Sequence, residues 1–181
     1  MLDLQEALPV KVVAAVLFQE QEGRWATACE AMADVWGPID MTGPPTPFTF
    51  TDYYTPEMGS ALVRQFVGFE RLVEPEALAA LKHDANAIEE RSLIGDKRAV
   101  NIDVGYLDYH KLVLASTKEG PQKVYVGSGI WADITLLYRK GAFQALPWTF
   151  LDFTTGAYTP FLLEAREHYR LQIRQNRKTR G

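Results

Sequence analysis

The chain has 181 residues, of which 47% are hydrophobic and 23% are charged, and its formal net charge is −4. A chain of this length and composition buries a core without disulfides or metal ions, which excludes a disordered or disulfide-stapled protein. Its single cysteine, Cys29, excludes an intrachain disulfide and a paired-cysteine metal site. The longest strongly apolar run, residues 12–18, is too short to cross a bilayer, and residues 1–9 lack the layout of a signal peptide. We therefore expect one cytoplasmic domain over residues 1–181, with no membrane association.

The charge is unevenly distributed along the chain. From Phe161 onward there are six Lys or Arg and two Glu, a local sum of +4, whereas the remaining thirteen basic and twenty-one acidic residues sum to −8. An acidic body argues against a broad nucleic-acid-binding face. Only the basic tail remains a candidate for nucleic acid.

The first half of the chain predicts a strand, a helix and further strands. Residues 10–18 form a valine-rich apolar run, typical of a strand that is buried on both faces. Residues 23–36 carry apolar side chains at helical spacing. Phe and Thr alternate over residues 48–54, which predicts a strand. Residues 62–73 fit either a helix or a strand, and Gly68 with the Phe and Val content favours a strand over the second half.

The middle of the chain predicts a helix, a strand and a short helix. Residues 74–91 space their apolar side chains 3-4-3, which is typical of a helix. Residues 99–103 are typical of a strand, and residues 104–106 of a bend at its end. Asp108 is expected to cap a short helix over residues 109–115.

The last third predicts a β-meander and a terminal helix. Strands over residues 123–126 and 130–139 flank a Gly-Ser-Gly turn, and a further short strand follows. Residues 160–178 form an amphipathic helix, and residues 179–181 a frayed tail. Because the first six elements follow the β-α-β-β-α-β ferredoxin-like order, we predict an α/β fold of the α+β type. Its sheet is expected to be mixed, with the helices mainly on one face.

Two segments, residues 51–59 and 98–118, concentrate polar residues where a predicted strand ends. Side chains from adjacent strands converge at such ends, which is where binding sites tend to form. If the segments are neighbours, Asp52, Glu57 and Asp103 form a carboxylate cluster that acts as acid and base or holds a hard divalent cation. These three are the predicted catalytic residues, and Asp52 and Asp103 are the ligands of any metal.

The same segments carry cations and aromatic side chains suited to a small anionic ligand. Arg98, Lys111 and Lys118 are expected to hold its anionic group. The predicted ligand-binding residues are Tyr53, Tyr54, Arg98, Asn101, Tyr106, Lys111 and Lys118.

A purely structural interpretation of these residues stays open. Asp103 and Asp108 would then cap turns or a helix. Asp52 would pair with Arg64 or Arg71, and the tyrosines would pack in the core.

Two familiar signals are set aside. Residues 127–132 match a G-x-G-x-x-A dinucleotide fingerprint, but that motif needs a following helix, and residues 130–139 are β-branched and aromatic. Of the three histidines only His110 lies in a polar segment, which argues against a histidine-rich zinc or copper site.

The terminal helix places Arg166, Arg170, Arg174 and Arg177 on one stripe. The stripe is interpreted either as the solvated edge of a docked helix or as a row of arginines that bind the phosphates of RNA or of a nucleotide. Interleaved aromatic residues that would stack on bases are missing from it.

Several strings resemble the bacterial "domain of unknown function 4416" family. They are FTDYYTPEMG at 50–59, FERL at 69–72, VNIDVGYL at 100–107, KLVLASTK at 111–118, GIWADITL at 129–136, and Trp148-Thr149. The resemblance runs from about residue 9 to residue 153. The family usually has a proline where this chain has Val104, and Asp133 matches its acidic position. The resemblance implies no established activity, and it makes these positions the first to test: Asp52, Tyr53, Tyr54, Glu57, Asn101, Asp103 and Lys118.

The sequence thus favours a cytoplasmic ligand-binding domain for a nucleotide or phosphorylated small molecule, with enzymatic activity left open. The alternative is a non-enzymatic interaction or adaptor module, which predicts a large exposed apolar patch and no concave polar pocket. RNA binding through the terminal helix comes third. Cofactor and oligomeric state do not follow from the sequence.

Overall fold

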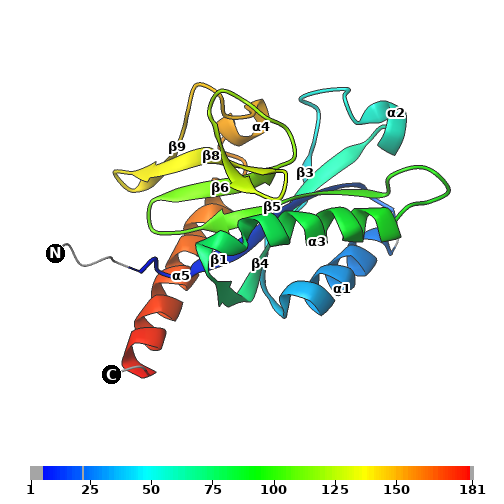
Figure 1. Ribbon diagram of the computed structural model, residues 1–181. Helices are drawn as coiled ribbons and strands as arrows, with labels where there is room; N and C mark the ends of the chain where they lie inside the picture. Colours follow the sequence, from blue (N-terminus) through cyan, green and yellow to red (C-terminus); the bar gives the residue numbers. More distant parts are fainter. Residues whose placement is uncertain (1–5, 22, 180–181) are drawn as a thin grey trace.

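A computed structural model describes residues 6–21 and 23–179 (Figure 1). The predicted features at residues 1–5 and 180–181 lie outside this range. The strands are β1 Val10–Gln19, β2 Ile39–Thr42, β3 Thr46–Pro47, β4 Leu62–Val73, β5 Val100–Leu107, β6 Lys111–Ser116, β7 Lys123–Gly127, β8 Ile130–Arg139 and β9 Ala142–Ala145. The helices are α1 Arg24–Trp36, α2 Thr55–Met58, the 3-10 helix η1 Pro75–Ala77, α3 Leu78–Arg91, α4 Leu151–Thr154 and α5 Thr159–Thr179.

The strands form one sheet in the order β2-β4-β1-β5-β6-β8-β7, with β3 paired to β4 and β9 to β8. Every pairing in the described part of the chain is antiparallel, so the predicted mixed sheet is wrong. Helix α1 joins β1 to β2 across the intervening β4, and α3 joins β4 to β5 across β1. Each crossover places a parallel strand two positions away in the sheet, with one strand between, so immediate neighbours are antiparallel. The chain is therefore an α+β protein.

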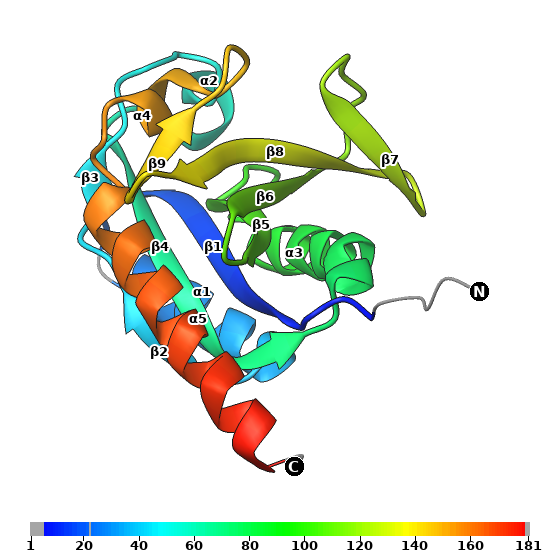
Figure 2. The ribbon, with the colours of Figure 1, turned by 90° about the vertical axis from the view of Figure 1, so that its left-hand side faces the viewer.

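Two apolar cores cover the two faces of the sheet. Along β1, Val12, Ala14 and Val16 pack in the core that contains α1 and α3, whereas Val13 and Ala15 pack in the core that contains α5. This alternation confirms the prediction of a first strand buried on both faces. Figure 2 shows α5 on one side of the sheet and α3 on the other. The prediction that the helices lie mainly on one face is therefore corrected, because the longest helix covers the opposite face.

Residues 48–54 do not form the predicted strand. Pairing with β4 stops at Pro47, and the chain then turns into α2. The Tyr53 amide donates to Thr51 Oγ1 at 3.1 Å, and the Thr55 amide donates to the Asp52 carbonyl at 3.0 Å. Short polar side chains that bond to nearby backbone compete with a strand ladder, which overrides the alternating Phe and Thr pattern.

The predicted bend at 104–106 and the predicted helix over 109–115 are both wrong. Strand β5 continues to Leu107, and β6 begins at Lys111. Asp108 does cap a turn, but between these two strands, where its Oδ1 accepts the amides of His110 and Lys111 at 2.7 and 2.8 Å. The ambiguous residues 62–73 form a strand throughout. The helix over residues 74–91, the hairpin of β7 and β8, and the terminal helix are confirmed.

Candidate functional site

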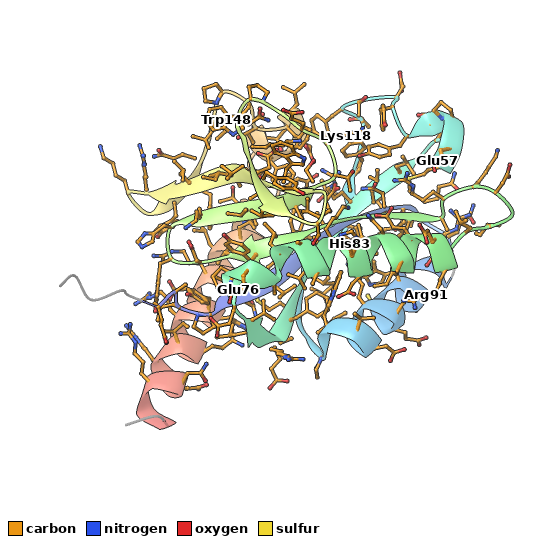
Figure 3. The ribbon with its side chains drawn as sticks, in the orientation of Figure 1. Glu57, Glu76, His83, Arg91, Lys118 and Trp148 are labelled. Atoms are coloured by element: carbon orange, nitrogen blue, oxygen red, sulfur yellow. The ribbon has the colours of Figure 1, made fainter. Side chains whose placement is uncertain are left out.

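The two predicted polar segments come together at one edge of the molecule. Arg98 Nε donates to Glu57 Oε1 at 3.1 Å, and Lys118 Nζ donates to Tyr53 Oη at 3.1 Å. Figure 3 shows Glu57, Lys118 and Trp148 along the same edge. The loop before α2 thus reaches across β5 to the end of β6.

A cleft of about 290 Å³ opens where α2 meets the loop between α3 and β5. Both polar segments contribute to its wall. The lining residues are Gln19, Arg24, Thr55, Pro56, Glu57, Met58, Gly59, Ile94, Lys97, Arg98 and Ala99. Three of these are cations and one is a carboxylate, so the lining carries an excess of positive charge.

The cations of the cleft differ in how far they are neutralised. Arg98 faces Glu57 and also lies 3.4 Å from Glu89 Oε2. Arg24 donates to the neutral amide oxygen of Gln19 at 3.0 Å. Within residues 6–21 and 23–179, the exposed Lys97 ammonium forms no ion pair. The uncompensated charge of the cleft therefore lies on Arg24 and Lys97.

A second cleft of about 280 Å³ adjoins the first and shares Arg24, Ile94 and Ala99 with it. Its remaining lining is uncharged. These residues are Gly23, Thr27, Ala28, Ser92 and Val100.

Arg64 is the centre of a buried charge network on the face of the sheet that α5 covers. Its side chain is 4% exposed, and its Nη1 is ion-paired with Asp152, which is 3% exposed. Tyr158 also donates to Asp152, at 3.1 Å. Arg64 Nη2 donates to Asp103 Oδ2 at 3.0 Å, and Asp103 is 29% exposed. The network thus presents one carboxylate, that of Asp103, to solvent.

Strands β5 and β6 pair only at one end. Their register covers Gly105 to Leu107 of β5, whereas residues 100–104 pair with β1 alone. At Gly105 the two backbones approach so closely that a Cβ would lie 2.0 Å from the Val113 carbonyl oxygen. Beyond this glycine the strands separate, which exposes backbone groups along one side of β5.

Side chains of α3 satisfy the backbone where β6 has separated. The Ile102 amide donates to Glu89 Oε1 at 2.6 Å, and Lys82 Nζ donates to the Ile102 carbonyl at 3.0 Å. Burial raises the pKa of Glu89, and nearby Lys82 opposes that rise. These two buried charged residues replace a missing strand partner.

Tyr54 and Asn101 lie between the cleft and the Arg64 network. Asn101 Oδ1 accepts Arg98 Nη1 at 2.7 Å. Burial raises the pKa of Tyr54 to about 12, and the charge of Asp103 adds to the rise. The phenol therefore stays protonated and is a hydrogen-bond donor near neutral pH.

Three predicted site residues lie apart from this arrangement. Asp52 is exposed, and its carboxylate makes no hydrogen bond or ion pair within the described residues, so it pairs with neither Arg64 nor Arg71. Tyr106 packs against the core beneath α1 and α3. Lys111 pairs with Asp108 at 2.6 Å in the turn at the opposite end of β5.

The expected carboxylate cluster is not formed in the described part of the chain. Glu57 faces Arg98, Asp103 faces Arg64, and Asp52 points to solvent. Over the same residues, three or more His, Cys, Asp or Glu side chains nowhere gather as metal ligands. The catalytic roles of these carboxylates remain predictions.

The arginine stripe of α5 is largely engaged within the protein. The Arg166 guanidinium lies 3.6 Å from the centre of the Tyr138 ring, and its Nε donates to the Tyr109 carbonyl at 3.0 Å. Arg170 pairs with Glu167 at 2.7 Å. Arg166 therefore helps to dock the helix, which differs from the expected solvated edge, whereas Arg170 pairs within the helix and Arg174 and Arg177 are exposed.

The sequence did not single out the buried charged residues around β5. Lys82, Glu89 and Asp152 lie in segments that resemble ordinary amphipathic helices. Arg64 stands within a largely apolar strand, where a charged residue between Val63 and the Gln65-Phe66 pair was the available signal. Lys97, in a short turn, gave no signal at all.

The model of the family described as "Domain of unknown function (DUF4416)" matches residues 8–169. The chain therefore belongs to this family, as the strings in the sequence indicated. No curated protein and no solved structure matches the chain. Among the described residues, a helix long and apolar enough to cross a membrane is not found.

Proposed function

We propose that this member of the family binds a small anionic molecule, a nucleotide or another phosphorylated compound, in the cleft between α2 and the α3–β5 loop. The observation that carries the proposal is the lining of this cleft, where two polar segments distant in sequence meet and Arg24 and Lys97 stay without a carboxylate partner among the described residues. Cations that line one recess without carboxylate partners attract a phosphate group, because their positive potentials add there.

Arg98 supports the same proposal in a different way. Its two carboxylate contacts, to Glu57 and Glu89, fix the guanidinium on the wall of the cleft. A positioned guanidinium receives an oxyanion with less loss of side-chain entropy than a mobile one does. Arg98 thus orients the ligand, whereas Arg24 and Lys97 supply the net charge.

Thermal unfolding of the full chain with inorganic phosphate, pyrophosphate and nucleotides tests the proposal. A ligand at a hundredfold excess over its Kd should raise the Tm by about 5–10 °C. Lys97→Gln should weaken binding about tenfold, the effect of one charge-assisted contact. Arg139→Gln is the matched control, because Arg139 is also exposed but lies at the far end of β8.

Two results would count against the cleft. The proposal fails if no phosphate compound shifts the Tm, and it fails equally if Lys97→Gln and Arg139→Gln weaken binding to the same extent. Equal weakening would mean that the ligand senses only the overall charge of the protein.

The edge strand β7 favours a second candidate function, that of an interaction module. Val124, Tyr125 and Val126 are consecutive and exposed on this strand, which has β8 as its one neighbour in the described sheet. An exposed apolar edge is a template for strand addition by another chain. If β7 serves this role, light scattering should show that the wild type self-associates and that the Val124→Lys variant is monomeric. If both proteins are monomeric, this second function loses its support.

We also infer that β1, α1, β2, β4, α3 and β5 form a ferredoxin-like core. The support is the order β2-β4-β1-β5 and the two helices that cross one face. A cytoplasmic location, in which phosphorylated metabolites are abundant, is part of the same proposal.

A further inference from the structure

Asn101 carries a buried hydrogen-bond donor without an acceptor. Its side chain is 6% exposed, and its Nδ2 has no partner among the described residues. The amide orientation is determined, because Oδ1 accepts Arg98 Nη1 at 2.7 Å and the other atom must therefore be the nitrogen. Buried donors are nearly always satisfied, so an unsatisfied one calls for an acceptor.

The second unsatisfied atom, Arg64 Nε, has a structural explanation. Its guanidinium lies 4.7 Å from the centre of the Phe48 ring and 5.8 Å from that of Phe153. Aromatic faces attract a cation without a hydrogen bond. The Asn101 amide is neutral and has no cationic attraction of this kind, and its nitrogen has no hydrogen-bond partner among the described residues, so it is the atom that points to a ligand.

Asp103 lies beside this donor on the same face of β5. The two residues are two positions apart, so their side chains point to the same side of the strand. Asp103 Oδ2 is held by Arg64, and that arginine is shared with Asp152. One cation between two carboxylates leaves a net negative charge, and the 29% exposed Asp103 presents it to solvent. This carboxylate repels a phosphate and accepts a hydrogen bond from a donor.

The pair therefore needs a ligand group that donates to Asp103 and accepts from Asn101. A hydroxyl does both, whereas a protonated amine offers no acceptor to Asn101 and the dianion of a phosphate ester offers no donor to Asp103. Arg98 connects this pair to the cleft, since it contacts both Glu57 in the cleft wall and Asn101.

We propose that Asn101 and Asp103 form a hydroxyl-binding subsite, and that the ligand is a polyhydroxy phosphate ester such as a sugar phosphate. Its phosphate occupies the cleft and its hydroxyls reach the pair. This inference rests on the proposed function, because the cleft supplies the phosphate site.

Tyr54 lies beside the subsite. It packs beside Leu17, whose partner in β5 is Asn101, and the charge of Asp103 adds to the rise of its pKa. The neighbouring Tyr53 is exposed and touches Lys118 in an exposed hydrogen bond. Exposed contacts of this kind are weak, so the contact between Tyr53 and Lys118 holds this loop only loosely.

Isothermal titration of the full chain with three probes tests the subsite. The probes are inorganic phosphate, pentyl phosphate and ribose 5-phosphate, of which the last two share a five-carbon skeleton and differ in their ring oxygen and hydroxyls. Ribose 5-phosphate should bind about tenfold more tightly than pentyl phosphate, the effect of a hydrogen bond to a charged group. Asp103→Asn and Asn101→Asp should each abolish that difference and keep the affinity for inorganic phosphate.

Two features of the variants keep the test decisive. Asn101→Asp retains the oxygen that accepts Arg98 and replaces the Nδ2 donor with a carboxylate oxygen, which adds one negative charge, so it serves if Asp103→Asn fails to fold. Asp34→Asn, an exposed position on α1, controls for a change of one charge.

Each remaining outcome is informative. Equal binding of the two esters, with phosphate still bound, overturns the hydroxyl subsite and leaves the proposed function standing. Preference for ribose 5-phosphate that persists in both variants also overturns the subsite. Binding of none of the three probes overturns the proposed function and the subsite together.

Discussion

Removal of the Asp152 carboxylate should destabilise the fold far more than removal of an exposed carboxylate with an equally close partner. Asp152 is 3% exposed and holds both the Arg64 guanidinium and the Tyr158 hydroxyl. Asp152→Ala leaves a buried cation with one partly exposed partner, Asp103, and removes the acceptor of a buried phenol. Breaking a buried pair in this way costs about 3–5 kcal/mol, a large part of a typical free energy of unfolding.

Urea unfolding, followed by circular dichroism, measures this loss. Glu167→Ala is the control: Glu167 pairs with Arg170 at 2.7 Å, but it lies on the exposed side of α5, where the free energy of unfolding should hardly change. The double variant Arg64→Met with Asp152→Leu should recover most of the loss, because it removes both charges at once. Similar effects of Asp152→Ala and Glu167→Ala would refute the assignment of a desolvated pair.

Three further outcomes follow from the structure. Gly105→Ala should lower the free energy of unfolding by at least about 2 kcal/mol in urea titrations, because its Cβ would lie 2.0 Å from the Val113 carbonyl oxygen. Burial raises the pKa of the Cys29 thiol to about 11, so its alkylation by iodoacetamide should be slow near neutral pH and rise about tenfold per pH unit below that pKa; a neutral-pH rate equal to that of free cysteine would contradict this. Burial also raises the pKa of Glu89 in the folded state above 4.5, so the stability from proton uptake is present below that value and is lost as pH rises through the folded pKa. Glu89→Gln should flatten this fall in unfolding free energy, and an unchanged slope would contradict the assignment.

The periodicity of the sequence predicted the elements that bury a regular face. Residues 10–18 and 74–91 behave as expected, because strand and helix spacing translate directly into buried sides. The bounds of the terminal helix were predicted to within one residue at each end. The face of the sheet that this helix covers was predicted wrongly. The face of the sheet that a helix covers depends on which strands become neighbours, and the pattern of a single sequence does not give that strand pairing.

The failures share a local cause. At residues 48–54 the alternation of Phe and Thr resembles a strand, but Thr51 and Asp52 close turns of their own. At Asp108 a capping residue was recognised correctly and assigned to a helix, whereas it caps a turn between strands. Capping chemistry is the same in both settings, so only the neighbouring strand decides between them.

The candidate site was predicted in part. The meeting of residues 51–59 with residues 98–118 is seen in the contact of Glu57 with Arg98 and that of Tyr53 with Lys118. Lys111 was assigned to the same site because it lies in the polar segment 98–118 with Arg98 and Lys118. Residues 111–116 instead form the strand β6. Lys111 lies at its start, beside Asp108, and Lys118 follows its other end.

The charged residues around the first half of β5 are difficult to explain by stability alone. Lys82 and Glu89 of α3 bind the backbone of this strand, and Arg64 binds its Asp103 side chain on the face that α5 covers. Apolar side chains of similar volume usually stabilise a core as well as buried charges do, or better. A continuous pairing with β6 would moreover satisfy the Ile102 backbone without any help from α3. The separation of the two strands beyond Gly105 therefore has its clearest consequence at Asn101 and the partly exposed Asp103: it keeps β6 away from the pair for which we propose a ligand.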